Sequence, residues 1–349
     1  MDALAGQTLR CRSSREYGAE YVYQVAPLGG RKLVAALSDC SIRVINAELS
    51  LASTTAVAKA HANQLAGLRV LSESTVVSAG DSTVKVWDLR SAGKAVQTME
   101  SDRGMNILSL DAAGTAVAAG TELASADAHV YVWDTRTGKR TAQYVDSHSD
   151  DVTAVAFAPP HPKLLLSGAT DGLVNVFDTT VADEDDAVHQ SINHGASIHS
   201  TGFLSPTRIY ALSHMETLAV YELASADEDA AEPPPNDLGD VRAAWDCEYV
   251  VDIYDGYAAV GSNSDGRLSL FPFVDERPLL DQRVTLAGGH GEEIARSVYL
   301  DRQNARVFTA GEDGAVRLWA PDSYTDADEW KESAGKKKKS KKDKRYKPY

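Results

Sequence analysis

Short runs of alternating apolar and polar residues recur along the chain at a nearly constant spacing. Four of them read DSTVKVWD (81–88), DAHVYVWD (127–134), DGLVNVFD (171–178) and DGAVRLWA (313–320). Each run begins with an aspartate and carries an aromatic residue six positions later. Alternation with a period of two predicts a strand with one buried face, and the acidic start predicts a tight hairpin turn before it.

Three weaker copies keep the same template: DCSIRVIN (39–46), DGRLSLFP (265–272) and METLAVYE (215–222), where Met215 replaces the aspartate. Counted from one register position to the next, the seven copies are 42, 46, 44, 44, 50 and 48 residues apart. Seven copies at nearly one period indicate a repeat architecture. The register positions are Ile45, Trp87, Trp133, Phe177, Tyr221, Phe271 and Trp319.

Other alternating runs lie upstream of each copy. The segments STVVSAG (74–80) and ARVFTAG (305–311) predict a strand that pairs with the copy, and VTAVAFAP (152–159) predicts a further one. Three such strands and a fourth make a sheet that is too small to bury its own faces. The copies must therefore stack on one another, which predicts an all-β repeat fold.

This pattern resembles the WD-repeat family over residues 1–323, and the resemblance implies a seven-bladed β-propeller. After Trp319 the chain continues PDSYTDADEW, which is too polar for a fourth strand, so we expect residues 7–12 to supply the outer strand of blade 7. Residues 324–349 are expected to be a disordered, lysine-rich tail. The expected blades are 15–50, 60–100, 102–145, 147–192, 194–238, 240–285 and 288–323.

In the WD-repeat family, a histidine before the first strand, a serine or threonine on the second, the turn aspartate and the tryptophan form a buried hydrogen-bonded tetrad. The resemblance implies complete tetrads in blades 2 and 7. Blade 4 departs from the pattern because Phe177 replaces the tryptophan and cannot donate a hydrogen bond. The matching residues are His61, Ser78, Asp81 and Trp87 in blade 2, His148, Ser167 and Asp171 in blade 4, and His290, Thr309, Asp313 and Trp319 in blade 7.

A closer similarity covers residues 148–188. The opening His-Ser-Asp-Asp, the run DGLVNVFD and the acidic insert after it are similar to the corresponding region of the WD repeat-containing protein 89 group. The similarity implies a eukaryotic, intracellular and nuclear WD-repeat protein.

Composition adds a charge asymmetry. The chain of 349 residues has 35 Lys and Arg against 50 Asp and Glu, a net charge of −15. Residues 331–349 hold ten basic and two acidic side chains, so the remaining 330 residues hold 25 basic and 48 acidic ones. No apolar run approaches the roughly 18 residues of a membrane helix, and no secretory signal is visible. Three distant cysteines fit a reducing compartment better than a disulfide framework.

Two acidic inserts follow the predicted third strands of blades 4 and 5, and Pro233–Pro235 stiffens the second. Both belong on the same face of the disc, where one negative patch would attract a basic partner. The alternative is a pair of solvated loops that only keep the protein soluble. The patch residues are Asp183, Glu184, Asp185, Asp186, Asp227, Glu228, Asp229 and Glu232.

The lysine-rich tail predicts nuclear import. An RNA contact is the alternative, with Tyr346 and Tyr349 available for stacking on bases. A third possibility is that the tail covers the acidic patch until a partner displaces it. Its basic residues are Lys336, Lys337, Lys338, Lys339, Lys341, Lys342, Lys344 and Arg345.

The segment DSTVKVWDLR (81–90) resembles the docking box of substrate receptors for cullin-4 ubiquitin ligases, and blade 3 nearly repeats it. The resemblance assigns contact with the ligase adaptor to Arg90 and Arg136. The alternative is that each arginine caps the end of a strand by pairing with a nearby carboxylate.

No phosphate-binding loop, His-Glu-x-x-His motif or nucleophile elbow is present. The spacing of His189, His194, His199 and His214 matches no zinc template, so we expect no metal site. Together with the missing motifs, this leads us to expect no cofactor, no small-molecule substrate and no catalysis. We predict a nuclear or nucleolar interaction scaffold, with a cytoplasmic pool, that escorts a basic client such as a ribosomal protein or histone. The alternatives are a cullin-4 substrate receptor and a scaffold subunit of an RNA- or chromatin-associated complex.

Overall fold

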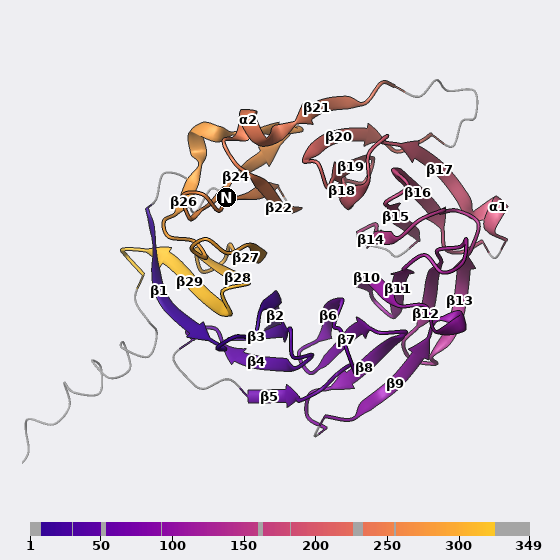
Figure 1. The fold of residues 1–349 in the computed structure, drawn as a ribbon, viewed down its shortest axis with the longest axis horizontal. Coiled ribbons are helices and arrows are strands. Elements are labelled where there is room, and N and C mark those ends of the chain that lie inside the picture. The colour runs from indigo at the N-terminus through magenta and orange to yellow at the C-terminus, as the bar shows by residue number, and fades with distance from the viewer. Residues whose placement is uncertain are drawn as a thin grey trace, which may run out of the picture.

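Seven small antiparallel sheets surround a central axis in the computed structural model (Figure 1). It describes residues 8–324 except 30, 50–53, 92, 160–162, 182, 226–232 and 255. Each sheet is one blade, whose first strand lies nearest the axis. Successive strands run in opposite directions. The loops that lead into the first strands and the turns between second and third strands therefore share one face, here called the upper face. The remaining connections lie on the lower face.

The strands follow the sequence order of the repeats. Blade 1 has β2 (Val22–Gly29), β3 (Lys32–Leu37), β4 (Ile42–Asn46) and β5 (Thr54–Val57); blade 2 has β6 (Gly67–Ser72), β7 (Thr75–Gly80), β8 (Thr83–Asp88) and β9 (Ala95–Glu100). Blade 3 has β10 (Ile107–Ala113), β11 (Ala116–Thr121), β12 (Val130–Asp134) and β13 (Lys139–Tyr144); blade 4 has β14 (Val152–Phe157), β15 (Leu164–Ala169), β16 (Leu173–Asp178) and β17 (Val188–Asn193).

Blade 5 has β18 (Ile198–Ser205), β19 (Arg208–Ser213), β20 (Thr217–Glu222) and β21 (Asn236–Asp240). Blade 6 has β22 (Tyr249–Tyr254), β23 (Tyr257–Ser262), β24 (Arg267–Val274) and two short partners of β24, β25 (Arg277–Pro278) and β26 (Val284–Leu286). Blade 7 has β27 (Ala295–Asp301), β28 (Arg306–Gly311) and β29 (Ala315–Pro321). The short helices are η1 (Asp102–Gly104), α1 (Glu184–Ala187), α2 (Val241–Trp245) and η2 (Leu280–Gln282), and no described helix has the length and apolar character needed to span a membrane.

The N-terminal strand closes the ring, as the sequence predicted. Strand β1 (Leu9–Glu16) pairs antiparallel with β29 as the outer strand of blade 7, and Figure 1 shows the two strands side by side. Leu9 is buried in the same apolar cluster as Trp319. The strand extends four residues beyond the expected 7–12, because pairing continues past a bulge at Arg12 to Glu16. Residue 7 lies outside the described residues.

Two blade boundaries differ from those expected by more than one residue. The outer strand of blade 1 is β5, beyond the expected limit at residue 50, and residues 15 and 16 belong to β1 of blade 7 instead. The outer strand of blade 5, β21, runs to residue 240. Loops of variable length precede these outer strands, so the aromatic register positions do not locate them.

The core consists of apolar clusters between neighbouring blades. The inward-facing residues of one sheet pack on those of the next, for example Val77 and Val86 of blade 2 on Val117 and Tyr131 of blade 3. The register positions Trp87, Trp133, Phe177, Phe271 and Trp319 are all buried. Because each sheet buries its faces only against its neighbours, the ring stabilises itself only when all blades are in place.

Candidate interaction surfaces

The histidine tetrad of blade 7 is a continuous hydrogen-bonded chain. Trp319 Nε1 donates to Thr309 Oγ1 at 3.0 Å, Thr309 Oγ1 lies 2.8 Å from His290 Nε2, and His290 Nδ1 lies 2.7 Å from Asp313 Oδ1. Burial lowers the pKa of His290, so the imidazole is neutral and donates from Nδ1. The chain ties the loop before β27 to strands β28 and β29.

Blade 2 brings only three of its four expected residues together. His61 Nε2 lies 2.7 Å from Ser78 Oγ, which accepts from Trp87 Nε1 at 2.9 Å. The other ring nitrogen, Nδ1, faces Thr83 Oγ1 at 3.2 Å instead of Asp81. Asp81 turns to the backbone and accepts from Ala62 N at 2.6 Å. A threonine at the start of the third strand thus replaces the aspartate as partner of the histidine.

Blade 4 keeps the contacts of the histidine with the serine and the aspartate and lacks the hydrogen bond from a tryptophan. His148 contacts Ser167 Oγ at 2.6 Å and Asp171 Oδ2 at 3.1 Å. Phe177 stacks on Tyr144 with ring centroids 4.0 Å apart. The aromatic position therefore contributes packing but no hydrogen bond to Ser167.

The four histidines of blades 4 and 5 serve separate contacts. His189 Nε2 lies 3.1 Å from the carbonyl of Ala224, and His194 lies between Tyr221 and Thr217. Only His199 and His214 come together, edge to face at 5.1 Å between ring centroids.

The first acidic insert forms α1 on the lower face, at the rim of the ring (Figure 1). Glu184 does not face solvent as a patch residue: it accepts from Val145 N at 2.7 Å and from Asp146 N at 3.0 Å. Asp183, Asp185 and Asp186 are exposed. The second insert residues, Asp227, Glu228, Asp229 and Glu232, lie outside the described residues.

Arg90 and Arg136 occupy equivalent places on the lower face, at the ends of β8 and β12. Each forms a two-point ion pair with the aspartate two residues before it. Arg90 donates to Asp88 at 2.9 and 2.7 Å, and Arg136 donates to Asp134 at 3.2 and 2.8 Å. Both side chains are exposed, at 75% and 70%. In both blades the ion pair fixes the side chain of the arginine to which the ligase resemblance assigns the adaptor contact.

The chain leaves blade 7 on the lower face through a buried charge network. Glu48 Oε1 accepts from Arg306 at 3.0 Å and from Arg31 at 2.7 Å, and Tyr324 donates to Glu48 Oε2. Tyr324 is the last described residue, so the basic residues 336–345 of the tail lie outside the described part of the chain.

The upper face carries a surplus of acidic side chains that the sequence pattern did not reveal. Its loops and turns hold eighteen acidic residues and three basic ones, whereas the described loop residues of the lower face hold ten acidic and seven basic ones. The upper-face acids are Glu20, Asp39, Asp81, Asp102, Glu122, Asp127, Asp146, Asp150, Asp151, Asp171, Glu216, Asp246, Glu248, Asp265, Glu292, Glu293, Glu312 and Asp313; the bases are Lys59, Arg103 and Arg242.

Some of these acids are taken up by structural partners, and others keep their carboxylates exposed to solvent even where they have a partner. Asp171 and Asp313 hold their histidines, and Glu312 pairs with Arg296 at 2.7 Å. Six are exposed to solvent: Asp246, which pairs with Arg267 and Arg283, and a further set of five, Asp146, Glu248, Asp265, Glu292 and Glu293. These five residues, here called the upper acidic set, come from the loops and turns of blades 4, 6 and 7.

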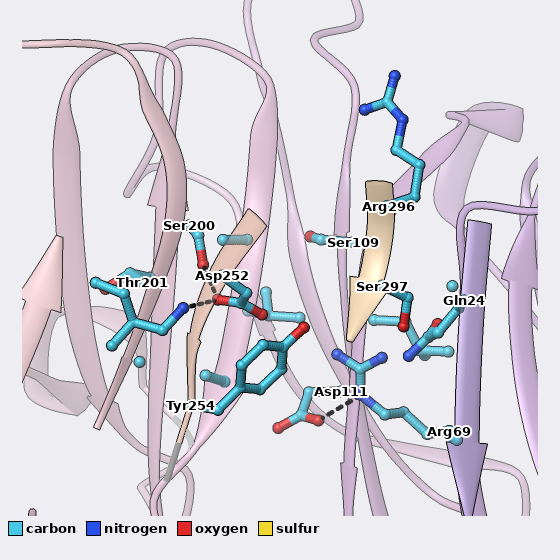
Figure 2. A pocket seen from close by; sticks show the side chains of 18 of the residues that line it. Gln24, Arg69, Ser109, Asp111, Ser200, Thr201, Asp252, Tyr254, Arg296 and Ser297 are labelled. Atoms are coloured by element: carbon cyan, nitrogen blue, oxygen red, sulfur yellow. Dashed lines mark hydrogen bonds and ion pairs between the residues drawn. The ribbon is translucent and has the colours of Figure 1, made fainter. Parts of the chain in front are cut away.

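A channel of about 620 Å³ runs along the axis and is lined by the first strands of all seven blades. Two of its charged groups pair inside it, in the contact between Arg69 Nε and Asp111 Oδ1 at 2.9 Å (Figure 2). Asp252 lies midway along β22 and faces this channel. Burial raises the pKa of Asp252 above the usual range of an aspartate. Nothing in the repeat pattern marks this residue.

Comparison with known proteins places these features in context. The family profile "WD domain, G-beta repeat" matches residues 54–88 and 139–178. A Saccharomyces cerevisiae protein described as an "Uncharacterized WD repeat-containing protein" is 37% identical over 316 residues, covering 88% of this chain and 80% of that protein. The WD repeat-containing protein 89 homolog of Dictyostelium discoideum is 28% identical over 250 residues, covering 68% of this chain and 66% of that protein.

A solved structure has the same arrangement of blades. The WD40 beta propeller domain of Doa1 superimposes with a TM-score of 0.68 over 91% of this chain and 98% of that chain. The two sequences are 13% identical, so the likeness concerns the fold.

Proposed function

The chain belongs to the WD-repeat β-propeller family, as its repeats predicted, and on that premise we propose that it is a non-enzymatic scaffold that binds a basic client protein. A rigid ring with loops on two faces presents separate docking surfaces without any moving part. Propellers of this family typically serve as protein-interaction scaffolds, and this supports the general assignment. The chemistry of the client follows from the surface charge.

The observation that carries this proposal is the acidic surplus of the upper-face loops and turns, which hold eighteen acidic and three basic residues. Arginines outside these loops, such as Arg267, Arg296 and Arg317, pair with some of these acids and leave the rest of the surplus unbalanced. A surface with one dominant sign attracts partners of the opposite sign and speeds their association. It also repels the phosphate backbone of nucleic acids. A basic protein, such as a ribosomal protein or a histone, has the complementary charge.

The acidic patch predicted from the sequence is a second docking surface in this proposal. Its described members Asp183, Asp185 and Asp186 are exposed at the rim of the lower face. The lysine-rich tail supports a nuclear or nucleolar location with a cytoplasmic pool, where such clients are assembled. Glu184 is left out of the patch in the experiment below because it accepts from the backbone amides of Val145 and Asp146 and from the hydroxyl of Ser147.

The test is a pull-down of the tagged full chain at two salt concentrations, with nuclease treatment, read by mass spectrometry. We expect a basic protein that survives nuclease and is lost at high salt. Neutralising the upper acidic set to Asn or Gln should reduce its recovery at least tenfold. Two further variants serve as comparisons: the patch variant Asp183, Asp185 and Asp186 to Asn, and the lower-face control Glu73→Gln, Asp275→Asn and Asp281→Asn.

The outcomes separate the surfaces. Loss of the client in the patch variant alone would move the docking site to the lower face. An unchanged client list in both acidic variants would contradict the proposal. Recovery only of RNA-dependent partners would favour the alternative of a scaffold subunit in an RNA- or chromatin-associated complex.

The cullin-4 receptor stays an alternative that rests on Arg90 and Arg136. Their exposure supports access by an adaptor, whereas their pairing with Asp88 and Asp134 supports the role of strand caps. Replacing both arginines with Ala distinguishes the two. A ligase adaptor that is recovered with the wild-type chain and lost with this variant would establish the receptor.

A further inference from the structure

Asp252 is held in the axial channel by one of its two carboxylate oxygens. Three donors reach Oδ1: Ile253 N at 2.8 Å, Tyr210 Oη at 3.1 Å and Ser200 Oγ at 3.3 Å. Figure 2 shows the second oxygen, Oδ2, turned toward the open channel. Because three donors fix Oδ1, the direction of Oδ2 is set before any ligand arrives.

The charge of Asp252 is not balanced by a neighbouring cation. The two arginines that line the channel already have partners: Arg69 pairs with Asp111 at 2.9 Å and Arg296 with Glu312 at 2.7 Å. Among the described residues, no Lys, Arg or His lies within ion-pair distance of Asp252, and Arg69 acts on it only from farther away. Asp252 is half-buried and has no ion-pair partner among the described residues, so a cation that enters the channel would gain a charge partner there.

The lining of the channel suits an aliphatic chain with a charged end. Its lining runs from Tyr23 and His199 near the upper ends of the first strands to Phe203 and Tyr299 farther down. The rings can contact a methylene stem while the charged group lies on Asp252. The upper mouth is surrounded by the acidic loops, which favour the approach of a cation from that side.

We propose that the channel receives one lysine side chain of the basic client, entering from the upper face, with its ammonium group on Oδ2 of Asp252. This inference rests on the proposed function and names the contact that anchors the client. Lysine is preferred over arginine because a guanidinium fork needs two free carboxylate oxygens, and Oδ1 is saturated by its three donors. An ammonium needs one such oxygen and can direct its other hydrogens at neutral acceptors in the channel.

The first experiment measures binding of short peptides to the full chain by saturation-transfer NMR at pH 7. The probes are acetyl-Gly-Ala-Lys-Ala-Gly-amide and the same peptide with norleucine or arginine in place of lysine, together with n-butylamine. We expect the lysine peptide to bind at least tenfold more tightly than each of the others. The measured quantity is the ratio of dissociation constants between probes. Competition from the chain's own lysines would weaken the binding of every probe by the same factor and would leave this ratio unchanged.

The matched variant is Asp252→Asn, which retains Oδ1 for its three donors and places an amide group toward the channel. We expect it to weaken the lysine peptide by tenfold to a hundredfold and to leave the norleucine peptide unchanged. Glu292→Gln is the control, since it removes one upper-face charge outside the channel. The melting temperature of each variant confirms that it is folded.

Four results would overturn the inference: equal affinity for lysine and norleucine, equal affinity for arginine, butylamine as tight as the peptide, or a folded Asp252→Asn protein that still binds the lysine peptide. The client pull-down separates this failure from failure of the proposed function. A client that is retained by Asp252→Asn but lost when the upper acidic set is neutralised would leave the acidic face in place and remove the channel contact.

Discussion

The buried charge network at the junction of blades 7 and 1 gives a prediction about how the ring is held closed. Arg306, Glu48 and Asp301 are 6%, 4% and 8% exposed. Arg306 donates to Glu48 at 3.0 Å and to Asp301 at 3.1 and 2.7 Å, and so joins residues 258 positions apart in the sequence. Replacing Arg306 with Met removes the cation and leaves two buried carboxylates.

The size of the effect follows from burial. Breaking a buried ion pair on one side costs about 3–5 kcal/mol, because the remaining charge stays desolvated. Here Glu48 keeps Arg31 and Tyr324, and Asp301 keeps Asn304, so the value belongs at the lower end of that range. With roughly 2 cal/mol/K of unfolding entropy per residue, 3–5 kcal/mol corresponds to a fall of about 4–7 °C in melting temperature.

The matched control is Arg90→Met, which breaks an ion pair of similar geometry at the surface. Its arginine is 75% exposed and the pair is screened by solvent, so the loss should be far smaller than for Arg306→Met. The assay is urea unfolding followed by tryptophan fluorescence, with calorimetry for the melting temperature. A loss below 1 kcal/mol for Arg306→Met, or equal losses for the two variants, would refute the reasoning.

The pH dependence provides a second check on the same network. Burial alone raises the pKa of Glu48, but the hydrogen bonds from Tyr324 and Arg31 and the charge of Arg306 outweigh it and lower the net pKa. A carboxylate with a depressed pKa stabilises the fold fully above its unfolded pKa and loses that contribution as the pH falls through its folded pKa. The difference between wild type and Arg306→Met should therefore shrink below about pH 4.5.

Three further predictions concern the tetrads, the buried histidines and ring closure. Thr309→Val removes the hydroxyl that links Trp319 to His290 and should lower the free energy of unfolding in urea by about 2–3 kcal/mol. Thr83→Val in blade 2 removes only one longer contact and should lower it by about 1 kcal/mol. Equal losses would contradict the difference between the two blades. Burial lowers the pKa of His61 and His199 to about 4, so the folded state binds fewer protons than the unfolded state. The free energy of unfolding should therefore have its full value above pH 6.5 and should fall between pH 6.5 and 4 by up to roughly 3 kcal/mol per histidine. His199→Gln should make the melting temperature fall less steeply over that range, and an unchanged slope would exclude His199 as a source. Deleting residues 1–14 removes most of β1, including Leu9 from the cluster around Trp319, and should lower the melting temperature sharply; an unchanged value would exclude closure by the N-terminus.

The strands were predictable because their signal is local. Alternation and a turn aspartate decide where a strand of this fold begins, and both can be read within eight residues, as in DGAVRLWA (313–320). The contacts among His290, Thr309 and Asp313 were implied by the resemblance to the WD-repeat family, and the structure contains them. Ring closure was predictable for a different reason: blade 7 lacked a fourth strand after Trp319, and β1 was the alternating segment left over.

The remaining features depend on contacts that a local sequence pattern does not reveal. Asp81 fits the pattern, yet Thr83 takes its place beside His61. Blades 4 and 7 have Leu173 and Ala315 at the position of Thr83, and neither side chain can form a hydrogen bond. Asp252 becomes distinctive only when Tyr210 of the neighbouring blade reaches it. The acidic upper face likewise emerges only when loops from all seven blades are gathered on one side.

Carbodiimide cross-linking of the isolated client complex tests the central claim most directly, because this reagent joins carboxylates to amines in direct contact. The account predicts cross-links from client lysines to the upper acidic set, identified by mass spectrometry after digestion. The lower-face residues Glu73, Asp275 and Asp281 should remain unmodified by the client. Cross-links confined to the lower face, or a complex in which no client lysine joins any carboxylate of the upper face, would contradict it.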